Sequence, residues 1–275
     1  MANFKDISST NELIKYLELK GGNHDFYYHY TDIESLEKII ENGTFLLTRG
    51  NALSINDQHE AKMKGCWQTW NKTYIGSFAF GSAENMAMWG LYCLPPEDAV
   101  RICIPKAAMK IWLENIDSIS AWKDGIKTLK ISAFEKALSD IVYIEGKKGD
   151  ESFKLLRASE QLKVENNNEF YRVDEKEEMT GYIKNAAWKY ENEVRLKIKL
   201  QHAVGNDKIC VPIPSETLNA ITVTTGPQFE WRESTVLQRL EKESRILESD
   251  FSNLLNYRLL CSKCTYERFM RKNNG

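Results

Sequence analysis

The stretch of sequence that says most about the fold and the chemistry is Trp188-Lys189-Tyr190-Glu191-Asn192-Glu193-Val194-Arg195-Leu196. Its pattern predicts a β-strand, whose side chains alternate between two faces. One face of this strand then carries Glu191, Glu193 and Arg195. The positive charge of the arginine can keep a neighbouring carboxylate of a site ionised. The alternative is the solvated face of an edge strand, where such an ion pair adds little stability. This segment alone leaves both interpretations open.

Helix and strand patterns alternate along the rest of the chain. Helices are expected to start at N-terminal signals formed by Ser9, Thr31, Asn56 or Asp57, Ser82 and Pro105. Strands are expected at residues 26–30, 44–48, 74–80, 100–104, 189–200, 208–213 and 220–225. Together these elements predict an α+β fold, with helices flanking a mixed sheet.

The predicted organisation is one domain over residues 1–228 and a charged helical extension over residues 229–275. Between about residues 145 and 180, acidic and basic side chains crowd together and large apolar side chains become rare. We therefore expect a surface insertion with one helix there, and not a core element.

Composition excludes several classes of protein. The chain has 275 residues, 42% of them hydrophobic, and a net charge of −2, so it can bury a sizeable core and is not broadly polybasic. A nucleic acid would have to be held by a local patch. The 7 Trp, 12 Tyr and 11 Phe argue against disorder, and the 4 His leave few candidates for imidazole chemistry.

The cysteines and the N-terminus predict a cytoplasmic protein. Cys261 and Cys264 have a CxxC spacing, but no second pair or nearby histidine completes a zinc site, so no metal is expected. The N-terminus lacks the apolar stretch of a secretory signal, and no apolar run is long enough to span a bilayer. Reduced thiols in the cytoplasm fit this pattern.

Two further segments are candidates for a site. In Tyr28-His29-Tyr30-Thr31 a histidine lies within an aromatic strand, where a core histidine satisfied by the backbone is the alternative. In the segment after Ser82, Trp89 and Tyr92 share a helix face and could stack on a planar ligand, although core packing is the more common role of such a pair. Glycine-rich nucleotide-binding motifs and the zinc-protease motif are absent from the sequence.

Taken in order, four motifs resemble a large bacterial family of once-uncharacterised domains. They are Tyr28-His29-Tyr30-Thr31, Asn56-Asp57-Gln58-His59-Glu60, Trp89-Gly90-Leu91-Tyr92 and Trp188 through Arg195, which together span about two-thirds of the chain. That family is similar to the ADP-ribosyltransferase superfamily, in its diphtheria-toxin-like histidine–tyrosine–glutamate branch. The resemblance implies a split mixed or antiparallel sheet core and an enzyme that uses NAD as co-substrate without a metal.

The resemblance also implies roles for particular residues. It makes Glu193 the catalytic glutamate and Glu191 the first acid of an E-x-E pair. It places NAD against His29, Tyr30, Thr31, Arg49, Trp89 and Tyr92, and the substrate against Trp188 and Arg195. A carboxylate beside the ribose would stabilise the charge that develops as nicotinamide leaves, and the second acid could orient or deprotonate the acceptor.

The expected function is that of a toxin or anti-phage effector that transfers ADP-ribose to a nucleic acid, with RNA favoured over DNA. An antitoxin or chaperone partner is a further expectation from the resemblance. Three alternatives stay open. They are a protein acceptor, an NAD glycohydrolase that uses water as acceptor, and a non-catalytic interaction domain that keeps the fold as a scaffold.

Overall fold

The computed structural model describes residues 7, 9–52, 67–145, 154–156 and 178–252. Contacts between residues divide the chain into two units. Unit 1 contains Met1–His29, Asn42–Ser82 and Ile104–Ala220, and unit 2 contains Tyr30–Glu41, Ala83–Cys103 and Ile221–Gly275. The units are built from segments that alternate along the chain, which differs from the predicted boundary at residue 228.

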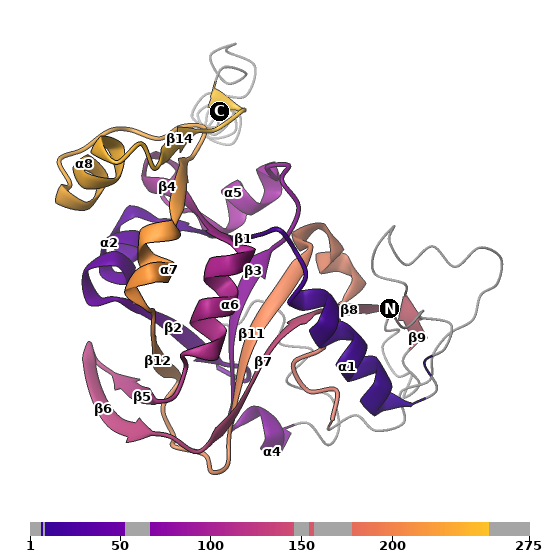
Figure 1. The fold of residues 1–275 in the computed structure, drawn as a ribbon. Coiled ribbons are helices and arrows are strands. Elements are labelled where there is room, and N and C mark those ends of the chain that lie inside the picture. Colours follow the sequence, from indigo (N-terminus) through magenta and orange to yellow (C-terminus); the bar gives the residue numbers. More distant parts are fainter. Residues whose placement is uncertain (1–6, 8, 53–66, 146–153, 157–177, 253–275) are drawn as a thin grey trace, which may run out of the picture. The chain divides into compact units, whose positions relative to one another are not determined.

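Unit 1 contains most of the strands (Figure 1). Its main sheet has the order β7-β11-β3-β2-β12-β5-β6, all antiparallel, and β1 also pairs with β3. These strands are β1 (Phe26–Asp32), β2 (Thr44–Arg49), β3 (Thr73–Ala79), β5 (Ile119–Lys123), β6 (Ile126–Ile131), β7 (Phe134–Asp140), β11 (Glu193–Leu200) and β12 (Lys208–Pro212). A smaller sheet has the order β10-β8-β9, with β8 (Val142–Glu145), β9 (Lys154–Leu156) and β10 (Ile183–Asn185).

Helices pack around the two sheets of unit 1. They are α1 (Thr10–Gly21), α4 (Trp67–Trp70), α6 (Lys106–Glu114), α7 (Ser215–Ala220) and the 3-10 helix η4 (Ala186–Glu191). On one face, Trp112 of α6 packs against Phe45 and Phe78, with ring centroids 5.6 and 6.2 Å away. Leu13 and Leu17 of α1 join a second apolar cluster. That cluster also contains Tyr16, Val142, Met179, Tyr182 and Ile183.

Unit 2 is smaller and also mixed. Strand β4 (Ala99–Pro105) pairs antiparallel with β13 (Thr222–Thr225), which pairs parallel with β14 (Ile246–Glu248). Its helices are α2 (Ile33–Asn42), α5 (Met86–Tyr92), the 3-10 helix η2 (Pro96–Asp98) and α8 (Thr235–Lys242). The boundary between the units passes through β1 after His29 and through β4 after Cys103, and it falls at the last residue of α2.

The structure confirms an α+β fold, and most predicted elements are present. Residues 119–145 form four strands that the sequence analysis did not predict. Two cap assignments were wrong. Asp32, not Thr31, accepts from the backbone N–H of Ser35, and Asn85, not Ser82, caps α5 by accepting from the N–H of Ala87. In both cases, the side chain that lies nearer the first turn of the helix accepts a hydrogen bond from a backbone N–H group that has no acceptor within the helix.

The extension after residue 228 is not purely helical in its described part. Helix α8 begins behind the N-cap Ser234 and buries Val236, Leu237 and Leu240, but the chain then forms strand β14. No helix within the described ranges is long and apolar enough to cross a membrane. The start of the predicted Asn56 or Asp57 helix, the Cys261–Cys264 pair, the basic C-terminal end and most of the 145–180 insertion lie outside the described residues. The described end of that predicted helix forms α4.

Candidate functional site

The candidate site is built on two neighbouring strands of unit 1, β3 and β11. Their antiparallel register places Glu193 opposite Ala79 and Arg195 opposite Ser77. Directly opposed residues share a face of a sheet, so Glu193, Arg195 and Ser77 lie on the same face. Strand β11 also pairs with β7, and its residues from Glu193 to Ile198 are buried. The alternative of a solvated edge strand is therefore wrong.

Glu191 does not belong to this strand, so its predicted place on the same strand face is wrong as well. Residues Ala186–Glu191 form η4, and Asn192 adopts a left-handed conformation with φ 45° and ψ 55°. The strand starts only at Glu193 because the turn at Asn192 breaks the alternation between Glu191 and Glu193. Asparagine tolerates this conformation better than most residues.

Four donors converge on the carboxylate of Glu193. Arg195 donates from Nε to Oε1 over 2.8 Å and from Nη2 to Oε2 over 3.1 Å. Lys184 donates from Nζ to Oε2 over 3.0 Å, and the hydroxyl of Ser77 donates to Oε1. Only 2% of Glu193 is exposed, so this acid is held almost entirely by protein groups.

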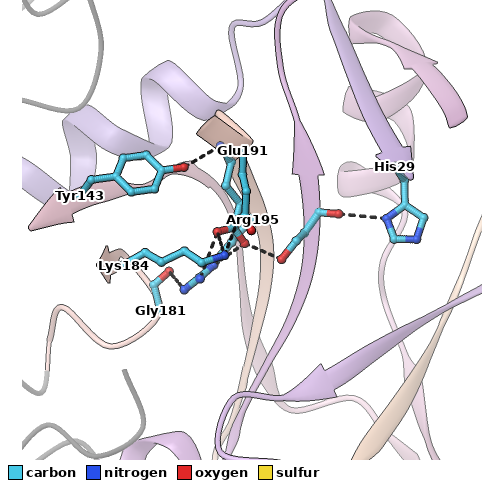
Figure 2. A network of polar contacts seen from close by, with 8 residues as sticks. His29, Tyr143, Gly181, Lys184, Glu191 and Arg195 are labelled. Atoms are coloured by element: carbon cyan, nitrogen blue, oxygen red, sulfur yellow. Dashed lines mark hydrogen bonds and ion pairs between the residues drawn. The ribbon is translucent and has the colours of Figure 1, made fainter. Parts of the chain in front are cut away.

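Lys184 also forms an ion pair with Glu191, so one ammonium contacts both acids (Figure 2). Lys184, Glu191 and Arg195 are all buried. Tyr143, on β8, accepts a hydrogen bond from the backbone N–H of Glu193 over 3.0 Å. The smaller sheet therefore supplies two of the groups that hold the acids.

The electrostatics keep Glu193 ionised. Burial by itself raises the pKa of a carboxylate, but Arg195 and Lys184 outweigh it and lower the pKa of Glu193 from 4.5 to about 2. Burial raises the pKa of Tyr143 well above its ordinary value, and the nearby Glu193 charge adds to this. The site thus offers an ionised carboxylate beside a neutral phenol at neutral pH.

His29 is connected to this network through Ser77. Its Nδ1 lies 3.0 Å from the backbone carbonyl of Ser77, whose hydroxyl reaches Glu193 (Figure 2). The register between β1 and β3 joins Tyr28 to Ala79, and the imidazole ring reaches β3 two residues away from that pair. The ring also packs near Phe45 and Phe78, with centroids 4.8 and 5.7 Å away. Ser77 therefore contacts Glu193 through its hydroxyl and His29 through its backbone carbonyl, and the His29 ring packs against Phe78, whose side chain lies on the opposite face of β3 from that of Ser77.

The aromatic candidates belong to unit 2 and are described within it. The rings of Tyr30 and Trp89 meet edge to face at 4.9 Å, and Trp89 is only 4% exposed. The indole N–H of Trp89 donates to Glu84 over 2.9 Å. Thr31 is buried, whereas Tyr92 is partly exposed. Trp89 thus has the environment of a packed core residue, the alternative that the sequence left open.

The last two candidates, Arg49 and Trp188, also lie in unit 1. The guanidinium of Arg49 lies at the β2–β12 end of the sheet and pairs with Asp207 over 2.5 Å. Trp188, on η4, has its ring centroid 5.2 Å from Nζ of Lys184. Trp188 is therefore adjacent to the acid cluster.

Sequence reasoning missed Lys184 as a functional candidate and gave Ser77 no role. Lys184 is a single cation in the otherwise apolar or neutral segment Tyr182-Ile183-Lys184-Asn185, and Ser77 is the exposed residue of an otherwise buried strand. Each is a polar residue in an otherwise apolar or buried strand, and a polar residue in such a place is a reason to look for a functional role. Their partners, however, lie on other elements, 116 residues away in the sequence for Ser77 and 7 and 9 residues away for Lys184.

Comparison with known proteins adds one family and no function. A family model described as "Protein of unknown function (DUF2971)" matches residues 88–196, which is less than half of the chain. The matched range contains Lys184, Glu191, Glu193 and Arg195 but not His29. The comparisons with curated proteins and with solved structures returned no significant match.

Proposed function

We propose that this chain is an NAD-dependent ADP-ribosyltransferase that transfers ADP-ribose to an acceptor and releases nicotinamide. The observation that carries the proposal is the buried, ionised Glu193, which lies beside the exposed Ser77 and is linked through it to His29. This arrangement agrees with the roles that the sequence resemblance implies for Glu193 and His29.

The chemistry of the site supports this reaction. Loss of nicotinamide leaves positive charge on the ribose, and a fixed carboxylate stabilises such charge more strongly in a buried site than in water. Of the four donors to Glu193, Ser77 is the neutral one and the exposed one. A ribose hydroxyl could therefore replace the Ser77 hydroxyl at Oε1 without separating an ion pair.

We further propose that the protein acts in the cytoplasm as a toxin or anti-phage effector and that its acceptor is a nucleic acid, with RNA favoured over DNA. The support is the sequence resemblance together with the exposed rings of Phe26 and Trp231, since bases stack on accessible aromatic rings. The reduced, buried Cys93, Cys103 and Cys210 agree with a reducing compartment. An antitoxin or chaperone would be its protein partner.

An NAD glycohydrolase is the second candidate, and the burial of Glu191 favours it. Glu191 is 4% exposed, so an acceptor larger than water must find a way to this acid. A protein acceptor would face the same constraint. A glycohydrolase would need Glu193 but not Glu191.

The experiment that tests the function uses NAD labelled in the ADP-ribose part and incubated with total RNA, DNA and protein from cells. Transferase activity predicts label in one fraction with the wild-type chain and none with Glu193→Gln. Free ADP-ribose alone would identify a glycohydrolase. Intact NAD with the wild-type chain, or equal label with Glu193→Gln, would contradict an enzymatic role for Glu193 and favour the scaffold.

A further inference from the structure

Lys184 joins two acids that come from different elements. Glu193 is the first residue of β11, whereas Glu191 ends η4 and is separated from the strand by the left-handed Asn192. Lys184 reaches both carboxylates from β10, in the smaller sheet. Within the described contacts, this single ammonium spans the break that Asn192 makes between the two acids.

The four charged groups balance each other. Glu191 and Glu193 supply two negative charges, and Lys184 and Arg195 supply two positive charges. Arg195 already holds Glu193 with two hydrogen bonds, a geometry that fixes the carboxylate plane. Without Lys184, Glu193 would keep this support, but Glu191 would face the like charge of Glu193 without the ammonium between them.

We propose that Lys184 is the positioning residue that holds Glu191 beside Glu193 and thereby directs the site toward transfer and away from hydrolysis. This inference rests on the proposed function. In the reaction, the bond between the nicotinamide nitrogen and the ribose carbon breaks, and its electron pair leaves with nicotinamide. The acceptor heteroatom forms the new bond to that carbon, and its proton passes to the Glu191 carboxylate and then to solvent.

The geometry gives the two acids separable tasks. Glu193 stabilises charge on the ribose and is held by two hydrogen bonds from Arg195, whereas Glu191 serves the acceptor and forms an ion pair with Lys184. Loss of the Lys184 charge should therefore reduce transfer far more than it reduces cleavage of NAD. Because Lys184 acts through Glu191, the two residues should not contribute independently.

The test measures label transfer and nicotinamide release for Lys184→Met, Glu191→Gln and the double variant. The probe is labelled NAD with total cellular RNA, and DNA and protein are assayed in parallel. We expect each single variant to lower transfer by about 10- to 100-fold and to lower nicotinamide release by a clearly smaller factor. The double variant should transfer no less than Glu191→Gln alone.

The variants include controls for folding and charge. Lys189→Met removes a lysine from the exposed side of η4 and should leave both rates unchanged. The double variant keeps the buried charges balanced, so it stays informative where Lys184→Met alone fails to fold. Lys184→Arg keeps the charge and should recover part of the transfer.

Some results would overturn the role of Lys184 and leave the proposed function intact. These are an equal loss of transfer and nicotinamide release, independent effects in the double variant, or a wild-type chain that releases nicotinamide without labelling any fraction. A wild-type chain that does not cleave NAD would instead overturn the proposed function itself.

Discussion

At the scale of single residues, Glu193 combines near-complete burial with a negative charge. A lone buried carboxylate would take up a proton, because removing its charge from water costs more than protonation. Here Arg195 and Lys184 reverse that preference, and the pKa falls to about 2. The charge is thus built into the folded state and does not depend on a bound ligand.

This shift in pKa predicts how stability changes with pH. The folded state lowers the pKa of Glu193 from 4.5 to about 2, so its contribution is complete above pH 4.5 and is lost as the pH falls through 2. The shift corresponds to a contribution of about 3 kcal/mol. Unfolding by urea between pH 6 and pH 2.5 should show a steeper loss of stability for the wild-type chain than for Glu193→Gln.

The comparison between the two proteins removes the contribution of the acids that lie away from Glu193 and its charged partners. A charge-balanced variant, Glu193→Gln with Lys184→Met, provides a second reference without the unpaired cation. Parallel pH profiles for the wild-type chain and both variants would contradict the assignment of a lowered pKa to Glu193.

The residues that sequence reasoning could find are those with a local pattern. Glu193 and Arg195 alternate along one strand, and His29 interrupts an aromatic strand. Ser77 and Lys184 could not be assigned because their role depends on partners 116 and 9 residues away in the sequence, on other elements. A pattern within one segment carries no information on such contacts.

At the scale of elements, the junction between η4 and β11 decides where Glu191 lies. The sequence predicts one strand from residue 189, because Glu191, Glu193 and Arg195 continue the alternation of a strand. The left-handed Asn192 overrides this pattern, and its carbonyl accepts from the backbone N–H of Phe80 over 3.0 Å. A single backbone conformation therefore separates the two acids.

This junction can be tested by changing Asn192. Glycine adopts positive φ without steric cost, so Asn192→Gly should keep stability within about 1 kcal/mol of the wild-type chain. Valine is β-branched, and we expect Asn192→Val to lower the free energy of unfolding by about 1–3 kcal/mol. Denaturant unfolding checks both values. Equal stability of the two variants would show that position 192 does not require a left-handed backbone.

At the scale of the whole molecule, the sequence predicts the α+β class and most of the elements. It could not predict the two interleaved units, because they arise from contacts between segments that are distant along the chain. Among the strands of residues 119–145, β6 was missed because it is almost fully exposed and lacks a buried face. The net charge of −2 remains a constraint on function, since any nucleic acid must bind at a local patch.

The most direct test of the central claim is the rate of nicotinamide release from NAD by the purified chain, compared with Glu193→Gln. The control is Glu135→Gln, which changes an exposed acid on β7, the neighbouring strand of β11. We predict that Glu193→Gln and its charge-balanced form with Lys184→Met lower the rate by at least about 100-fold, whereas Glu135→Gln retains it. Equal rates for the wild-type chain and folded Glu193→Gln would contradict the assignment of Glu193 as the catalytic carboxylate.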